Sequence, residues 1–395
     1  MDYDICIIGG CGHVGLPLGM AFAEQNKQVV LYDINQKAVD SVNAGKLPFM
    51  EEGGEKLLKQ VTKSKKLQAS SDIASVRNSK VVVMVIGTPV DEHLNPRVHD
   101  IFHALKDIEA ELQDDQLLVM RSTLYPGTTD KVHAYLQRKG KKTLVAFCPE
   151  RIVEGKALTE LHELPQIVAG CTPEAQKEAT ELFSVLTNKV VTVQPKEAEL
   201  AKLFTNTWRY INFAISNQFY MIANTDGLDF YKIYDAMTQD YPRLKAFAKA
   251  GLAAGPCLFK DTMQLAAFSS NDFFLGHSAM LINEGLPGYV VESMLAKQDL
   301  SDKTVAVLGM AFKANNDDPR ESLSYKLMKR LDFEAKEVLC NDPYINDPRF
   351  VPLDEIKKRA DIIVVATPHK DYADIDWGNK EVIDMWNYYG KGGLI

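Results

Sequence analysis

Residues 4–15 of the chain read DICIIGGCGHVG, and residues 28–33 read QVVLYD. The apolar run 4–8 predicts a strand, residues 12–25 a helix and 28–32 a second strand. Gly10, Gly12 and Gly15 have the GxGxxG spacing that brings a pyrophosphate close to a helix N-terminus, with His13 and Val14 in the same turn. A carboxylate at Asp33 would accept hydrogen bonds from an adenosine ribose and disfavour a 2′-phosphate. The stretch therefore predicts a dinucleotide-binding unit that prefers NAD to NADP.

Short apolar runs continue along the first half of the chain. They lie at 81–86, 117–121, 144–147, 167–168 and 190–193. Most are β-branched and do not alternate with polar residues, as is typical of strands buried on both faces of a parallel sheet. We therefore predict a doubly wound α/β domain over residues 1–195.

A long helix is predicted after this domain. Residues 197–226 contain neither Pro nor Gly, and Gly227 follows as a stop signal. The apolar residues of this segment cover more than one narrow stripe, so we expect burial on several sides and a homodimer interface. The segment belongs to a predicted central helical domain, residues 196–298.

A second α/β pattern closes the chain, with strands expected at 304–308, 337–340, 362–366 and 382–384. The predicted third domain covers residues 299–395. The expected fold class is α/β, with two Rossmann-like doubly wound domains joined by a central helical domain that contains one long helix.

The composition excludes several classes of protein. The 395 residues are 46% hydrophobic and 25% charged, which is ordinary for a globular chain. A net charge of -8 argues against nucleic acid as a partner. No apolar run reaches the roughly 18 residues of a membrane span. The six cysteines form no CxxC pair, which argues against a disulfide framework or a zinc site; we expect a cytoplasmic protein with no metal.

Cys257 is the cysteine with the most suggestive context. It follows Gly255-Pro256 and precedes Lys260-Asp261, and a helix-compatible stretch runs from Lys260 to Phe268. A helix N-terminus and a nearby cation favour a thiolate, which is the form of cysteine that attacks carbon. The alternative is an inert packed cysteine, which is our interpretation of Cys6, Cys11, Cys148 and Cys340, while we expect Cys171 in a loop.

Further polar residues gather on the long helix and at strand ends. Lys202 and Asn206 are four residues apart and share a helix face, where they could stabilise an oxyanion or simply be solvated. The segments 121–127 and 148–151 each end a predicted strand, which is where ligands bind in this architecture. Glu150 and Glu154 could act on a proton or a water, or be ordinary surface acids.

Taken together, these motifs resemble the UDP-glucose/GDP-mannose dehydrogenase family along nearly the whole chain. The matching stretches are Gly87-Thr88-Pro89, Ser122-Thr123 with Pro126-Gly127, Pro149-Glu150 with Gly155, Lys202-Leu203 with Asn206-Thr207, Cys257 with Asp261, Gly309 to Lys313 with Asp317-Asp318 and Arg320, Asp342-Pro343, Ala360-Asp361, and Asp384 to Asn387. They occur in the family's order.

The resemblance implies an NAD-dependent, four-electron oxidation of a UDP-sugar C6 alcohol to the uronate, which serves as a polysaccharide or glycan precursor. Cys257 would form the thiohemiacetal and thioester, Lys202 and Asn206 would stabilise oxyanions, and Asp261, Thr123 and Glu150 would position water and move protons. The implied cofactor contacts are Gly10, Gly12, His13, Val14, Gly15, Asp33, Thr88, Pro89, Thr123, Glu154 and Arg320. The implied substrate contacts are Glu150, Arg151, Lys202, Asn206, Arg209, Arg243, Gly255 and Lys313.

The resemblance indicates the identity of the substrate's sugar less clearly than it indicates the reaction. The segments 148–151, 206–212 and 241–244 resemble the UDP-N-acetylhexosamine subgroup, whereas Lys260 before Asp261 resembles the UDP-glucose subgroup. Pro256 replaces the His that the N-acetyl subgroup has before the cysteine, and Met280 replaces the Arg of an Ala-Arg pair that is common before the Ile282-Asn283 stretch. We favour a UDP-N-acetylhexosamine such as UDP-ManNAc or UDP-GlcNAc, with a UDP-glucose 6-dehydrogenase as the alternative.

Two other classes remain open from sequence. A single-step NAD-dependent β-hydroxyacid dehydrogenase also joins a Rossmann domain to helices, but it needs neither a nucleophilic cysteine nor a second α/β domain. A non-catalytic sugar-nucleotide sensor would have no need to keep Cys257, Lys202, Asn206 and Asp261.

Overall fold

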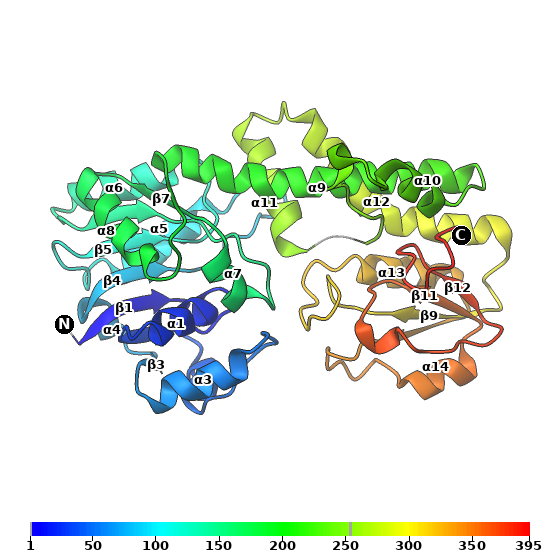
Figure 1. The fold of residues 1–395 in the computed structure, drawn as a ribbon, viewed down its shortest axis with the longest axis horizontal. Coiled ribbons are helices and arrows are strands. Elements are labelled where there is room, and N and C mark those ends of the chain that lie inside the picture. Colours follow the sequence, from blue (N-terminus) through cyan, green and yellow to red (C-terminus); the bar gives the residue numbers. More distant parts are fainter. Residues whose placement is uncertain (1, 253–254) are drawn as a thin grey trace. The chain divides into compact units, whose positions relative to one another are not determined.

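Two compact units make up the chain, spanning Met1–Thr205 and Asn206–Ile395. The structure, a computed structural model, describes residues 2–252 and 255–395. Each unit contains its own sheet, and helix α9 (Pro195–Thr225) continues from one unit into the other (Figure 1). The division into three domains at 195 and 298 stays a prediction.

The sheet of the first unit has eight strands among the described residues, in the order β3-β2-β1-β4-β5-β6-β7-β8. They are β1 (Tyr3–Ile8), β2 (Val29–Tyr32), β3 (Leu67–Ser70), β4 (Ser79–Met84), β5 (Leu117–Met120), β6 (Leu144–Phe147), β7 (Gln166–Gly170) and β8 (Val190–Thr192). The strand order reverses between β1 and β4, and ligands of doubly wound sheets bind beyond the carboxyl ends at such a reversal.

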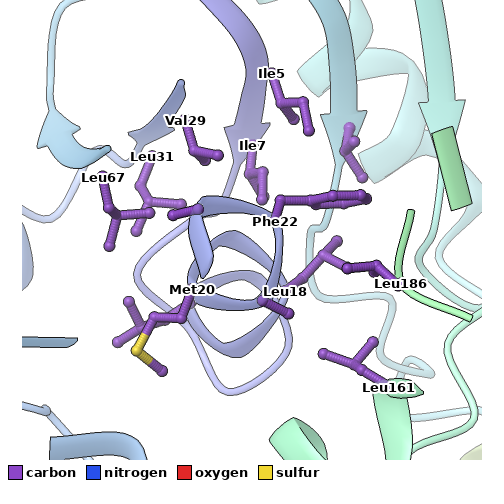
Figure 2. Packing of buried hydrophobic residues seen from close by; sticks show 14 of the residues in the cluster. Ile5, Ile7, Leu18, Met20, Phe22, Val29, Leu31, Leu67, Leu161 and Leu186 are labelled. Atoms are coloured by element: carbon purple, nitrogen blue, oxygen red, sulfur yellow. The ribbon is translucent and has the colours of Figure 1, made fainter. Parts of the chain in front are cut away.

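Helices cover both faces of this sheet. They are α1 (Gly15–Glu24), α2 (Gln36–Asn43), α3 (Gly54–Lys63), α4 (Ala74–Arg77), α5 (Val98–Ile108), α6 (Thr128–Arg138), α7 (Ala157–Glu163) and α8 (Pro173–Ser184). In β1, Ile5 and Ile7 belong to one buried cluster while Cys6 and Ile8 belong to the other. In Figure 2, Phe22 of α1 lies in the same buried cluster as Ile5 and Ile7. Burial on both faces explains why the strand sequence does not alternate.

The sequence pattern failed to predict strand β3 and the antiparallel direction of strand β7. Strand β3 contains the polar residues Gln68 and Ser70, and it lies at the sheet edge where only Leu67 and Ala69 are buried. Strand β7 pairs antiparallel with β6, and the other neighbouring strands pair parallel within the described residues. An apolar run does not encode its direction, which depends on the path of the connecting segment.

Helix α9 has 31 residues and matches the predicted long helix closely. The chain itself leaves one side of this helix exposed, so the expected burial on several sides stays a prediction that depends on the homodimer interface. Trp208, Ile215, Phe219 and Ile222 are all exposed and repeat at intervals of seven, four and three residues. Such spacing gathers them on one face of the helix, so this chain leaves an apolar stripe of α9 uncovered.

The second unit combines helices with a smaller sheet. Its helices beyond α9 are α10 (Phe230–Thr238), α11 (Pro256–Phe268), α12 (Phe274–Lys297), α13 (Ser324–Glu334) and α14 (Leu353–Arg359). The parallel strands β9 (Thr304–Leu308), β10 (Glu337–Asn341), β11 (Ile362–Val365) and β12 (Glu381–Ile383) follow the order β10-β9-β11-β12. All four lie within about a residue of the predicted strands, and the α/β fold class is confirmed.

The last residues of the chain bind the helices to this sheet. The Tyr220 hydroxyl on α9 donates to the Gly393 carbonyl at 2.7 Å, and the Ile395 amide donates to Asn224 Oδ1 at 2.8 Å. The Tyr231 hydroxyl on α10 donates to the Met385 carbonyl after β12 at 2.7 Å. These bonds account for one compact unit that includes both the helical segment and the second sheet.

Among the described residues, none of the helices combines the length and the apolar character that crossing a bilayer requires.

Candidate functional site

The glycine-rich turn after β1 forms a backbone cradle. A Cβ at Gly10 would lie 2.7 Å from Leu31 Cβ, and one at Gly15 would lie 2.6 Å from the Gly9 carbonyl oxygen. Both positions therefore need glycine for packing inside the protein. A Cβ at Gly12 would lie 3.6 Å from the Gly9 carbonyl oxygen, so the protein itself leaves room there. The side chain of Val14, the N-cap of α1, makes no capping hydrogen bond, which suits a helix that receives an anion at this end.

Asp33 stands beside this cradle, directly after β2. Its Oδ2 accepts a hydrogen bond from the Cys11 amide at 3.0 Å, and its Oδ1 accepts one from the Asn35 amide at 3.0 Å. The carboxylate is half-buried and fixed in orientation. His13 in the turn stacks on Phe49 with ring centroids 4.1 Å apart. The donor groups and the fixed carboxylate fit the pyrophosphate and a ribose of NAD.

Strands β4 and β5 bring two more predicted segments to the same carboxyl edge. Thr88 and Pro89 follow β4, and Thr88 is buried. Ser122 follows β5 and accepts a hydrogen bond from the Ile86 amide at 2.8 Å through its Oγ. Ser122 thus links the two strand ends, and the half-buried Thr123 is the next residue.

Glu150 is held by a partner that sequence reasoning missed. Its Oε2 accepts from Arg121 Nε at 2.9 Å and also from Arg121 Nη2, while its Oε1 accepts from the amides of Arg151 at 2.7 Å and Ile152 at 3.0 Å. Arg121 has no exposed surface, and its guanidinium carbon lies 4.9 Å from the Phe183 ring centroid. A buried arginine requires a partner. The arginine at the end of a predicted strand was therefore the sequence feature that could have pointed to this ion pair.

Hydrogen bonds fix the loop after Glu150 at several positions. Glu51 accepts hydrogen bonds from the Gly155 amide at 3.0 Å and the Leu158 amide at 3.1 Å. The Arg151 guanidinium donates to the Pro165 carbonyl. Glu154 is half-buried in this loop, and one of its carboxylate oxygens is fully buried. The two acids of this stretch, Glu150 and Glu154, are therefore not ordinary surface residues.

Helices α9 and α11 meet at a buried carboxylate. Asn206 on α9 donates through Nδ2 to Asp261 Oδ2 at 2.6 Å, and Lys260 Nζ lies 3.6 Å from Asp261 Oδ1. Asp261 has no exposed surface, and Cys257 precedes it by one helical turn. The thiol is exposed in the first turn of α11, where the helix dipole favours a thiolate. Lys202 lies one turn before Asn206 on α9 and is also buried.

The other five cysteines differ from Cys257 in their surroundings. Burial raises the pKa of each of these thiols to about 12. The thiols are those of Cys6, Cys11, Cys148, Cys171 and Cys340. At neutral pH they are therefore protonated, which suits a packing role.

Gly255, just before α11, packs against the segment that follows β9 in the same unit. Gly255 has a φ of +131°, and a Cβ there would lie 2.7 Å from the Phe312 ring. Phe312 precedes Lys313, whose Nζ is 5.7 Å from the centroid of that ring. Glycine at 255 therefore permits close packing between the cysteine loop and the Lys313 loop.

Three predicted arginines lie in different settings. Arg209 is half-buried on α9. Arg243 is exposed, and its Nη1 donates to the Tyr241 hydroxyl at 3.0 Å. Arg320 donates through Nε to both carboxylate oxygens of Asp318, each at 2.9 Å. Their substrate and cofactor roles stay predictions.

Asp342 is a hydrogen-bond centre of the second sheet, a role that its place in a matching sequence motif did not indicate. Its Oδ2 accepts from the amides of Met310 at 2.7 Å and Ala311 at 3.0 Å. The buried His369 contacts the same oxygen through Nε2 at 3.0 Å, and its Nδ1 accepts from the Asn315 amide at 2.9 Å. The carboxylate thus holds the ends of β9, β10 and β11 together at the edge that leads to Lys313.

Comparison with known proteins gives a consistent result along the chain. Residues 3–187 match the NAD binding domain of the UDP-glucose/GDP-mannose dehydrogenase family, residues 196–284 its central domain and residues 306–391 its UDP binding domain.

Individual relatives span almost the full chain. A UDP-N-acetyl-D-mannosamine dehydrogenase of Methanocaldococcus jannaschii is 31% identical over 94% of this chain and 87% of its own length. One of Pyrococcus horikoshii is 29% identical over 93% of this chain and 90% of its own length. A solved structure of UDP-D-ManNAc dehydrogenase from Pyrococcus horikoshii has a TM-score of 0.90 at 28% identity and covers 98% of this chain and 96% of that one.

Proposed function

Because this chain belongs to the UDP-glucose/GDP-mannose dehydrogenase family, we propose that it oxidises the C6 alcohol of a UDP-N-acetylhexosamine to the uronate through a thioester on Cys257. Family membership makes the chain an NAD-dependent oxidoreductase of nucleotide sugars. The observation that carries the finer proposal is the exposed Cys257 at the start of α11, with the Asn206–Asp261 hydrogen bond one turn behind it.

The cysteine accounts for the second oxidation. Loss of a hydride and a proton from the C6 alcohol leaves an aldehyde, and the Cys257 sulfur adds to its carbon to form a thiohemiacetal. Loss of a second hydride, together with the hydroxyl proton of that adduct, leaves a thioester; water then adds to its carbonyl carbon and the C–S bond breaks, which releases the carboxylate and returns the thiol. Bound NAD supplies the hydride acceptor for both oxidations, so two NAD molecules are consumed per sugar.

The buried polar residues have separate roles in this scheme. The Lys202 ammonium and the Asn206 amide stabilise the oxyanion on C6 as it develops. Asp261 orients Asn206 through their hydrogen bond and, with Thr123 and Glu150, positions the water that attacks the thioester. Arg121 keeps the Glu150 carboxylate in one orientation for that task. Lys313 neutralises charge on the diphosphate of the sugar nucleotide.

The choice of sugar rests on relatives and on short motifs. The relatives described above carry the name UDP-N-acetyl-D-mannosamine dehydrogenase. The segments 148–151, 206–212 and 241–244 favour the same subgroup. We infer an N-acetylhexosamine over glucose and a uronate product that enters glycan precursor synthesis. All six cysteines are free thiols, which supports a reducing, cytoplasmic setting.

We also infer that the working form is a homodimer. The exposed stripe of Trp208, Ile215, Phe219 and Ile222 on α9 offers an apolar surface to a second copy of the chain. A two-fold axis would bring the same stripe of both copies together.

A panel of UDP-sugars with NAD tests the activity directly. We expect NADH formation with UDP-N-acetylmannosamine or UDP-N-acetylglucosamine, at two NADH per sugar and with kcat/KM about tenfold above that for UDP-glucose. A higher value for UDP-glucose would establish the alternative sugar. One NADH per substrate would instead support the single-step dehydrogenase, and the absence of turnover with every sugar nucleotide would support the sensor.

A further inference from the structure

A buried carboxylate at the start of α9 has no role in the chemistry described above. Glu199 has no exposed surface. Its Oε2 accepts a hydrogen bond from the Gly127 amide, and its Oε1 accepts from the Thr129 amide at 2.8 Å and the Thr129 hydroxyl at 2.6 Å. Burial raises the pKa of Glu199, while the hydrogen bonds from Thr129 and Gly127 oppose the rise.

These three donors lie at the beginning of α6. Gly127 is the N-cap residue of α6, with a φ of +91°, and it has no side chain with which to cap the helix. Glu199 supplies the missing acceptor from 72 residues away in the sequence. Capping alone accounts for a stabilising role of this contact. It does not explain why the cap comes from α9 rather than from the loop itself.

Each side of this contact carries a residue of the proposed chemistry. Lys202 follows Glu199 by three residues, so the two lie on neighbouring positions of one helix face. Thr123 precedes Gly127 by four residues in the segment that connects β5 to α6. That segment is fixed at its other end as well, because Ser122 Oγ accepts from the Ile86 amide. A shift of Glu199 relative to Gly127 therefore changes the separation of Lys202 and Thr123.

We propose that Glu199 is a positioning residue that sets the α9 turn carrying Lys202 against the β5–α6 segment carrying Thr123. The proposal rests on the proposed function, since it concerns residues assigned to oxyanion stabilisation and water placement. Small errors in such placement have large effects, because a misplacement of about 1 Å can cost roughly a hundredfold in rate.

The test is Glu199→Gln, which keeps the size of the side chain. A glutamine has one acceptor oxygen, so its amide group must face either the Gly127 or the Thr129 donors. We expect kcat to fall by about tenfold or more, while the KM for NAD changes less than about threefold because the cradle and Asp33 lie on other strands.

A matched control is Gln116→Glu at the opposite end of β5. Gln116 is buried and donates through Nε2 to the carbonyls of Val76 at 2.8 Å and Ser79 at 2.6 Å. The reverse amide-to-acid exchange there breaks buried hydrogen bonds without touching a site residue. We expect Gln116→Glu to lower Tm at least as much as Glu199→Gln and to keep kcat within about twofold of wild type, both measured well below Tm.

The outcomes distinguish failure of the positioning role of Glu199 from failure of the proposed function. Equal kcat for Glu199→Gln and Gln116→Glu would overturn the positioning role and leave the proposed function standing. No turnover by the wild-type enzyme would overturn the proposed function and the positioning role with it. If Glu199→Gln fails to fold, Thr129→Val removes only the hydroxyl donor, and an unchanged kcat in that variant would count against the proposal.

Discussion

At the scale of single residues, exposure separates one cysteine from the rest. Cys257 is exposed at a helix N-terminus, while burial raises the pKa of Cys6, Cys148 and Cys340 to about 12. We expect Cys257→Ser to lose steady NADH production by at least about a thousandfold, or roughly 4 kcal/mol in barrier, since an alcohol is a far weaker nucleophile.

Steady-state NADH absorbance measures this loss. Intact-protein mass spectrometry then looks for an acyl adduct of sugar-nucleotide mass on Cys257→Ser. Cys340→Ala is the control, and we expect it to cost only stability. Iodoacetamide should inactivate the wild-type enzyme, with protection by the UDP-sugar. Near-normal turnover of Cys257→Ser with two NADH per sugar would end the thioester mechanism.

Asp33 decides the choice of cofactor at the same scale. A carboxylate held by the amides of Cys11 and Asn35 cannot move away from a 2′-phosphate. We expect kcat/KM for NAD to exceed that for NADP by at least about tenfold, or 1.4 kcal/mol, and Asp33→Ser to reduce the ratio. Asp40→Asn on the exposed surface of α2 is the control and should leave the ratio unchanged. Equal rates with both cofactors would contradict the assignment.

At the scale of elements, buried carboxylates connect strand ends that are distant in sequence. Asp342 is the clearest case in the second sheet. Its burial opposes ionisation, yet the hydrogen bonds from His369 and the backbone amides prevail and hold the pKa of Asp342 below its ordinary value of 3.8. The ionised carboxylate therefore stabilises the fold above that pH, and its contribution is lost as the pH falls through the lowered pKa.

Asp342→Asn should remove this contribution. An asparagine presents an amide to donors that need an acceptor, so we expect a loss of about 1–3 kcal/mol at pH 7. The acid dependence of Tm between pH 6 and pH 3 should also become shallower than in wild type. Asp302→Asn, at an exposed position, is the control. An unchanged slope in Asp342→Asn would show that this carboxylate does not govern acid stability.

The helices and strands also show which parts of the fold sequence patterns can predict. The strands of the second sheet were predicted within about a residue because their apolar runs are short and bounded by polar turns. Strand β3 was missed because an edge strand buries only Leu67 and Ala69, too few apolar residues to stand out. The sequence predicted an apolar long helix with a homodimer interface, but it did not show which side of α9 the chain leaves exposed.

At the scale of the whole molecule, the α9 stripe predicts a second copy. We expect light scattering to find a dimer at micromolar concentration and Ile215→Glu to shift it toward monomer, since a buried unpaired charge is costly. Phe333→Glu on α13 is a matched control, because Phe333 is 83% exposed and lies outside the stripe. A stable wild-type monomer at micromolar concentration would refute the interface.

The features that depend on neighbours along the chain were predictable from the sequence. These are the α/β class, the glycine turn with Asp33, the long α9 helix and the place of Cys257 near a helix N-terminus, because backbone freedom and apolar periodicity act over a few residues. The pairing of the buried polar and charged groups depends on the fold and was found only in the structure. Arg121 meets Glu150 across 29 residues, Asn206 meets Asp261 across 55, and Glu199 meets Gly127 across 72. Each buried group needs one partner in a low-dielectric interior, and chain separation alone does not say which of many candidates the fold will bring within reach.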